Sequence, residues 1–111
     1  MYKRQRDVDA FIKSSKLQEK AILANTSRNK WVLRREIKNF VGKRVDGVLI
    51  TESGILAAAH LAGPGNVKRY LRSYGAYGFS DAYGTSMRAY MKEFAGFDMS
   101  FIVADKRAKA L

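Results

Sequence analysis

The segment from Ile55 to Gly75, "ILAAAHLAGPGNVKRYLRSYG", decides the fold. Its first part, Ile55 to Ala62, is apolar on every helical face except at His60, which is the pattern of a helix buried on all sides. Gly63 suits the position that ends a helix, and Pro64 suits the first position of a new one. The second part repeats apolar residues along one helix face, namely Val67, Tyr70, Leu71 and Tyr74. The segment therefore predicts two helices joined by a tight corner.

The residues just before this segment predict a cap and a hairpin. Thr51 is a suitable N-cap for the buried helix, with Glu52 in its first turn. The stretch "KRVDGVLIT" places an Asp46-Gly47 turn between two short apolar pieces. We therefore expect a short extended loop or hairpin at about 44–50.

Further towards the N-terminus, the sequence predicts two helices. The first covers about Val8 to Lys13, and Ser15 caps the second, which runs from about Lys16 to Val41. The poor helix formers at 25–27 mark the point where a kink or break is expected. Glu19 and Glu36 on the long helix are expected to be solvated partners of nearby basic residues.

Downstream of the segment, an aromatic, glycine-rich loop precedes one more helix. Thr85 is expected to start this helix and Gly96 to stop it. Its inward residues are Met87, Tyr90, Met91 and Phe94. The segment from Met99 begins apolar and becomes charged, so we expect a short last helix or a frayed end. The chain as a whole is predicted to be all-α, apart from the extended piece at 44–50.

Composition sets limits on function. A length of 111 residues with 47% hydrophobic content suits one domain. The longest apolar run, Ile55 to Ala59, is too short to span a membrane. There is no cysteine and one histidine, so a thiolate metal site, a histidine cluster or a catalytic triad has little material, and no metal or cofactor is predicted.

The net charge of +11 suggests a polyanionic partner. Six of the 21 basic residues lie at the two ends of the chain, with Asp105 as the one acid there. Between Asp7 and Ala104 there remain 15 basic and 9 acidic residues, a net charge of +6. Nucleic acid, anionic lipid and the acidic polymers of a bacterial envelope all remain compatible with this charge.

Nucleic-acid binding is the alternative function that the opening segment raises. "LAGPGNVKR" resembles the helix-hairpin-helix pattern, in which backbone amides of a Gly-x-Gly turn bind phosphate. Gly63, Gly65, Lys68 and Arg69 would then form the phosphate site. Arg69, however, stands where that pattern has a small residue, and the helix before the turn is too apolar for an exposed hairpin. The simpler interpretation is a corner between two packed helices.

A longer resemblance covers roughly Asp7 to Asp98. "VDGVLITESGILAAAHLAGPGNVKRYLRS" (45–73) and "DAYGTSMRAYMKEFAGFD" (81–98) resemble the C-terminal half of a lysozyme-like peptidoglycan hydrolase domain found in phage-associated and secreted bacterial proteins. The family pattern runs close to V-x-G-V-x-I-T-x-S-G-L-L-A-A-A-H-L-x-G-x-G-x-V, followed by D-x-x-G-T-S and Y-x-x-x-F-x-G-Y/F-D. The resemblance implies a partial lysozyme-like domain over residues 7–98, a non-native or disordered head at 1–6 and a C-terminal tail at 99–111.

The same resemblance implies where the catalytic acid belongs. In this family the general-acid glutamate lies in the N-terminal half, in an E-S/T-G-G-like segment that does not occur here. We therefore expect the parent protein to possess a further N-terminal half of this domain. Glu52-Ser53-Gly54 is superficially similar but aligns with the later T-x-S-G turn. Glu52 is thus a weak catalytic candidate, since the start of a helix favours its charged form and a structural role.

The expected partner is the glycan strand of peptidoglycan, and the parent is expected to act in the bacterial periplasm or cell wall after delivery by a phage or a secretion apparatus. Hydrolysis and lytic transglycosylation both remain open. His60 is expected to be a hydrogen-bonded structural histidine, with lining of the groove as the alternative. Tyr77, Phe79 and Tyr83 are candidates for stacking on sugar rings, against the alternative of local packing.

Overall fold

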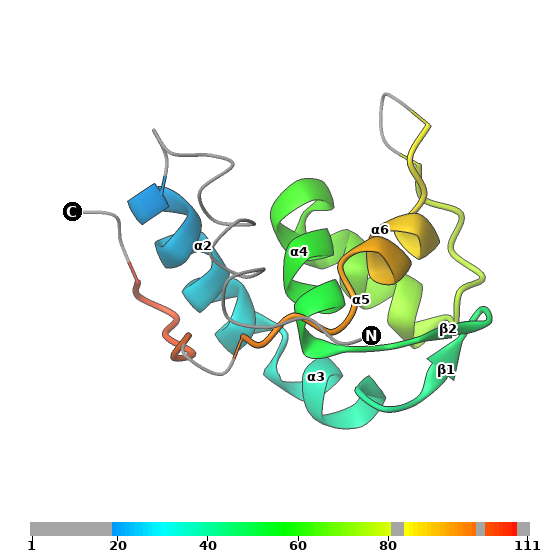
Figure 1. Cartoon of the computed structure of the whole chain (residues 1–111), viewed down its shortest axis with the longest axis horizontal. Helices are drawn as coiled ribbons and strands as arrows, with labels where there is room; N and C mark the ends of the chain where they lie inside the picture. The colour runs from blue at the N-terminus through cyan, green and yellow to red at the C-terminus, as the bar shows by residue number, and fades with distance from the viewer. Residues whose placement is uncertain (1–18, 81–83, 100–101, 109–111) are drawn as a thin grey trace.

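Helix α4, Glu52–Ala62, lies at the centre of the molecule. It contacts α2 (Glu19–Val32), α5 (Pro64–Arg72) and α6 (Met87–Glu93), which surround it (Figure 1). Residues 53–59 are all buried, as the apolar pattern predicted, and the alanines among them allow the neighbouring helices to approach closely. The prediction of complete burial is wrong at the end of the helix, where His60 is half-buried and Leu61 is exposed.

The protein is described by a computed structural model that covers residues 19–80, 84–99 and 102–108, with side chains from residue 24 onward. These residues form five helices and one two-stranded sheet. The fold is therefore predominantly helical, in agreement with the all-α prediction. None of the helices within these ranges is long and apolar enough to cross a membrane.

The small sheet is the hairpin predicted at 44–50. Its strands β1 (Arg44–Val45) and β2 (Val48–Leu49) are antiparallel, with Arg44 opposite Leu49 and Val45 opposite Val48. Asp46 and Gly47 have positive φ angles of 53° and 77°, as a two-residue hairpin turn with the right twist requires. Val45 and Val48 are buried while Arg44 and Leu49 are exposed, so only one face of the hairpin joins the core.

The ends of α4 are built as predicted. The Thr51 hydroxyl accepts a hydrogen bond from the amide of Gly54 at 3.1 Å and caps the start of the helix. Gly63 ends it with a φ of +91°, a conformation that favours glycine, and its amide donates to the Ala59 carbonyl. Pro64 is the first residue of α5. The sequence "AGPG" is thus a corner between two helices.

The predicted long helix from Lys16 to Val41 is wrong in one respect. Its described part is two helices, α2 and α3 (Arg34–Phe40), and the break lies at Leu33 rather than at 25–27. Leu33 is fully buried in the core, and α3 begins a new direction after it. The polar residues at 25–27 remain helical because Asn25 and Ser27 bond to His60 and to the Val103 carbonyl, respectively. Residues 1–18, which include the predicted helix at 8–13 and the Ser15 cap, lie outside the described residues.

Two further helix predictions need correction. Helix α5 ends at Arg72, so Tyr74 is not part of its buried face: Tyr74 is 62% exposed, with a φ of 53°. Its ring instead meets the edge of the Phe40 ring, with centroids 5.5 Å apart. Helix α6 is capped by Ser86 rather than begun by Thr85, because the Ser86 hydroxyl accepts from the Ala89 amide.

The main core lies between the hairpin and helices α3 to α6. Its buried members are Leu33, Phe40, Val45, Val48, Ile50, Ile55, Ala58, Ala59, Val67, Tyr70, Leu71, Met87, Tyr90 and Met91. A second, smaller cluster joins Leu56 of α4 to Met99 and Ile102. This second cluster draws the C-terminal segment against the helices.

The described C-terminal residues, 102–108, form no helix but are held along α2. The Lys30 ammonium donates to the Ile102 carbonyl at 2.7 Å, and the Asp105 amide donates to the Ser27 carbonyl at 3.0 Å. Figure 1 shows this segment running beside α2. The expectation of a last helix or a frayed end is therefore wrong for these residues, because bonds to a distant helix replace local helical bonds.

The prediction of a solvated Glu36 is also wrong. Its side chain is only 5% exposed, and Arg72 of α5 donates to its Oε2 from Nε at 3.1 Å and from Nη2 at 2.9 Å. The Arg72 side chain is itself 60% exposed. The pair therefore ties α3 to α5 and compensates the buried carboxylate, with the guanidinium partly in water.

The enclosed position of Ala58 generates a stability prediction. Ala58→Glu places an unpaired carboxylate at a site with no exposed surface, so we expect the domain to unfold or to lose on the order of 4 kcal/mol. Ala76→Glu, at an exposed loop position, serves as the control and should melt like the wild type. Thermal melting followed by circular dichroism measures both. Equal melting temperatures for the two variants would refute the burial of α4.

The ion pair between Glu36 and Arg72 generates a second prediction. Arg72→Met leaves a buried carboxylate without its partner, and we expect it to destabilise the fold by about 2 kcal/mol. Adding Glu36→Gln to this variant should recover part of the loss. Arg35→Met, at an exposed position on α3, is the matched control and should change stability by less than about 0.5 kcal/mol. Urea denaturation of these four proteins and of Glu36→Gln alone tests the coupling, and additive effects of the two single substitutions would contradict it.

Candidate functional site

The two halves of the motif pattern meet at the start of α4. The Ser53 hydroxyl donates to the Phe94 carbonyl at 2.6 Å and accepts from the Phe97 amide at 3.0 Å. At Gly54, an added Cβ would lie 3.0 Å from the Met91 carbonyl oxygen, so a larger residue would require the α6 backbone to shift. The T-x-S-G turn and the F-x-G-F segment therefore form one joint. Their residues serve the structure of the domain rather than contact with a ligand.

Glu52, the weak catalytic candidate, is part of an ion pair. Its carboxylate lies 3.4 Å from the Lys30 ammonium, and the same ammonium donates to the Ile102 carbonyl. Both side chains are partly exposed. A glycosidase acid instead requires an apolar pocket that holds the carboxyl group protonated. The surroundings of Glu52 therefore favour a structural role, in which it positions Lys30 against the C-terminal segment.

His60 lies near the other end of α4 and bonds to α2. Its Nδ1 is 2.8 Å from the side-chain amide nitrogen Nδ2 of Asn25. Because an amide nitrogen can only donate, Nδ1 accepts and the neutral ring carries its proton on Nε2. Burial lowers the pKa of His60 below its ordinary value of 6.5, which also favours the neutral ring. The structural interpretation of this histidine thus has a specific hydrogen-bond partner, while its role in a groove remains a prediction.

Tyr77, one of the predicted sugar-stacking residues, lies beside the corner between α4 and α5. The Tyr77 hydroxyl donates to the Asn66 side-chain oxygen at 2.8 Å, and the Asn66 side-chain nitrogen Nδ2 donates to the Ala62 carbonyl. Phe79 and Tyr77 are half-buried and pack against the main core. Tyr83 lies outside the described residues. These contacts are local packing, and stacking on sugar remains a prediction.

The corner itself provides little of a phosphate cradle. The Gly63 amide is already bonded to the Ala59 carbonyl, and Asn66 is engaged within the protein. Gly65 has open space around it, and the Arg69 guanidinium lies 5.9 Å from the centre of the Tyr77 ring. Lys68 is half-buried. The geometry favours the helix corner, and the DNA-binding alternative remains a prediction without support from these contacts.

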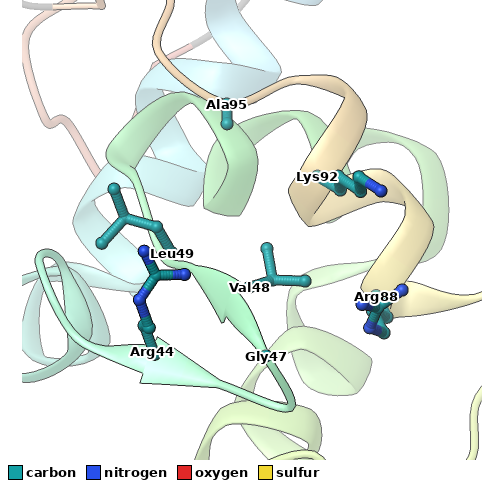
Figure 2. A pocket seen from close by; sticks show the side chains of 7 residues that line it. All are labelled: Arg44, Gly47, Val48, Leu49, Arg88, Lys92 and Ala95. Atoms are coloured by element: carbon teal, nitrogen blue, oxygen red, sulfur yellow. The ribbon is translucent and has the colours of Figure 1, made fainter.

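A pocket that sequence reasoning missed lies between the hairpin and α6. It has a volume of about 280 Å³ and opens to the surface (Figure 2). Its lining residues are Arg44, Gly47, Val48, Leu49, Arg88, Lys92 and Ala95. Arg88 and Lys92 are four residues apart on α6, a spacing that places both on one helix face and was visible in the sequence. The approach of Arg44 to that face depends on the fold.

Nowhere in the described residues do three or more His, Cys, Asp or Glu side chains form a group that could hold a metal ion. The predicted candidates also form no single site: Glu52 and His60 lie at opposite ends of α4, and Tyr77 lies beyond its corner with α5. The pocket beside the hairpin is a separate feature.

Comparisons of the chain with protein families, curated proteins and solved structures found no match. Any functional assignment therefore depends on the ordered motif residues and on the geometry described above.

The neutral state of His60 generates a pH prediction. Because its pKa is lower in the folded than in the unfolded chain, the unfolded chain binds more protons as the pH falls below 6.5. The stability that the neutral ring contributes is thus present above that pH and is lost as the pH falls through the lowered pKa. His60→Gln should show a smaller loss of melting temperature between pH 7 and pH 5 than the wild type. Parallel pH profiles for the two proteins would contradict the assignment.

Proposed function

We propose that the chain forms the core and one groove wall of a lysozyme-like domain that cleaves the glycan strands of peptidoglycan. In this proposal the chain corresponds to the C-terminal part of that domain, and the described residues do not provide the general acid. The observation that carries it is the joint at Ser53, which links two motif segments more than 40 residues apart in the sequence.

The joint supports the proposal because residues from separate parts of the motif pattern contact one another in it. A chance resemblance would scatter its matching residues over unrelated positions. Here Thr51 caps α4, Ser53 bonds to two residues just after α6, and Gly54 permits the contact with Met91. Gly63 ends the same helix. The ordered residues of the pattern thus build one element and its attachments.

Charge and shape agree with a polymeric, anionic ligand. The pocket between the hairpin and α6 is open and has three cationic residues in its lining. Bacterial wall polymers are anionic and extended, so a protein can bind them only in an open cleft. Glu52, paired with Lys30, remains in a structural role within this proposal.

A sedimentation assay with purified peptidoglycan sacculi tests the proposal. At roughly 150 mM salt, where exposed charges more than about 8 Å apart are screened, the chain should sediment with sacculi. Soluble glycan strands without peptides should release it, because they carry the sugar contacts together with the lactyl carboxylates that removal of the peptides leaves free. Duplex DNA of equal charge is the control competitor. Release by DNA but not by glycan strands would overturn the proposal and favour the nucleic-acid alternative.

Glu52→Gln refines the same assay. The variant should bind sacculi like the wild type, because Glu52 faces Lys30 in the structure. Wall lysis by both proteins is measured in parallel with their melting curves. Should Glu52→Gln abolish a lysis that the wild type performs, with an unchanged melting curve, the assignment of Glu52 as structural would be wrong.

A further inference from the structure

The pocket between the hairpin and α6 combines cationic and aliphatic groups. Arg44 reaches it from β1, and Arg88 and Lys92 reach it from α6. Val48, Leu49 and Ala95 supply the apolar part of the lining, and none of the lining residues that the structure describes is acidic. Figure 2 shows Val48 between Arg44 on the hairpin side and Arg88 on the helix side. Such a lining suits one anionic group with an aliphatic neighbour.

The cations differ in how far the protein itself neutralises them. Arg88 donates from Nε to the Asp46 backbone carbonyl at 2.9 Å, and the Asp46 carboxylate lies 4.0 Å away, at the limit of an ion pair. The hairpin turn thus holds Arg88 in position while its terminal nitrogens lie beside Gly47. Arg44 and Lys92 form no ion pair with any other described residue. Within the part of the chain that the structure describes, two of the three charges are therefore available to a ligand.

The positions of these cations are unfavourable for α6 in the absence of a ligand. Like charges four residues apart on a helix repel each other, and Arg88 and Lys92 stand at that spacing. Arg44 adds a third positive charge from the facing strand. An anion in the pocket would convert this repulsion into attraction. A guanidinium that is already positioned also loses less conformational freedom on binding.

The apolar part of the lining restricts the kind of anion. A nucleic-acid strand is held by a track of cations with aromatic side chains on which bases stack. Among the described residues, the lining of this pocket has a single cluster of cations and no aromatic side chain. Val48 and Leu49 offer aliphatic contact next to the charges. A carboxylate on a short aliphatic residue matches both halves of the pocket.

We propose that this pocket binds a free carboxylate of the peptide stems attached to the glycan strands of peptidoglycan. This assignment rests on the function proposed above and specifies which part of the wall polymer the chain recognises. Arg44 and Lys92 provide the charge, Arg88 is held in place by the hairpin turn, and Val48 and Leu49 contact the aliphatic part of the stem residue.

The test compares sacculi whose carboxylates are intact with sacculi whose carboxylates are converted to neutral amides by carbodiimide and ammonia. Both preparations are first freed of phosphate polymers with hydrofluoric acid. Arg44→Gln and Lys92→Gln should each weaken binding to intact sacculi about fivefold, the effect expected for one partly exposed charge pair. On amidated sacculi the wild type should bind as weakly as these variants or more weakly.

Matched variants separate this site from general charge attraction. Arg35→Gln and Lys38→Gln remove the same charges from exposed positions on α3, outside the pocket, and should bind intact sacculi within about twofold of the wild type. Equal weakening by pocket and control variants, or no effect of amidation, would overturn the assignment. Loss of binding on removal of the phosphate polymers would overturn it in favour of a phosphate ligand.

The competition with peptide-free glycan strands distinguishes the two proposals. If these strands release the wild type but the pocket variants bind like the controls, only the carboxylate assignment fails. If the strands release nothing, the proposed function fails and the carboxylate assignment fails with it. Melting curves of all variants accompany the binding data, and these exposed substitutions should leave the melting temperature within a few degrees of the wild type.

Discussion

The close contact between the first turn of α4 and the end of α6 is the constraint on which the rest of the structure depends. Gly54 lies so close to the Met91 backbone that an added Cβ would be only 3.0 Å from the Met91 carbonyl oxygen, and Ser53 bonds to both the Phe94 carbonyl and the Phe97 amide. Because this joint holds the start of α4 against α6, the hairpin that precedes Thr51 lies beside α6. The pocket between hairpin and helix is a consequence of the same joint.

The contact between α2 and α4 shows a different solution to packing. Helix α2 has no apolar stripe, and its Thr26 and Asn29 are buried against the helices. Two polar pairs, one between Asn25 and His60 and one between Lys30 and Glu52, connect the helices in antiparallel order. Hydrogen bonds add little net free energy to folding but are costly to break when buried. These two pairs therefore determine the orientation of α2 more than they raise the stability of the fold.

The basic residues of the chain are divided between structural and unpaired positions. Lys30 and Arg72 hold distant segments together, and Arg34 and Lys106 lie over the Trp31 ring, with centroid distances of 3.8 and 5.2 Å. These cations have partners within the protein. In the hairpin pocket, by contrast, Arg44 and Lys92 form no ion pair with another described residue, so the location of charge is more informative than the net value of +11.

The sequence by itself determined the features that depend on residues within about four positions of each other. The cap at Thr51, the corner at Gly63 and the turn at Asp46 follow from local hydrogen bonds and backbone preferences, and all three were predicted. The burial of most of α4 followed from its composition. The lysozyme-like resemblance and the roles of His60 and Tyr77 towards a ligand remain predictions, since no match or bound partner tests them.

Only the tertiary structure decided the features that join distant parts of the chain. The break at Leu33 coincides with the burial of this residue in the core. The buried pair of Glu36 with Arg72 and the path of residues 102–108 along α2 depend on contacts between residues more than 30 positions apart. The pocket depends on the approach of Arg44 to α6 in the same way. Local sequence could not predict them, because whether a charge is solvated or buried depends on which surface folds against it.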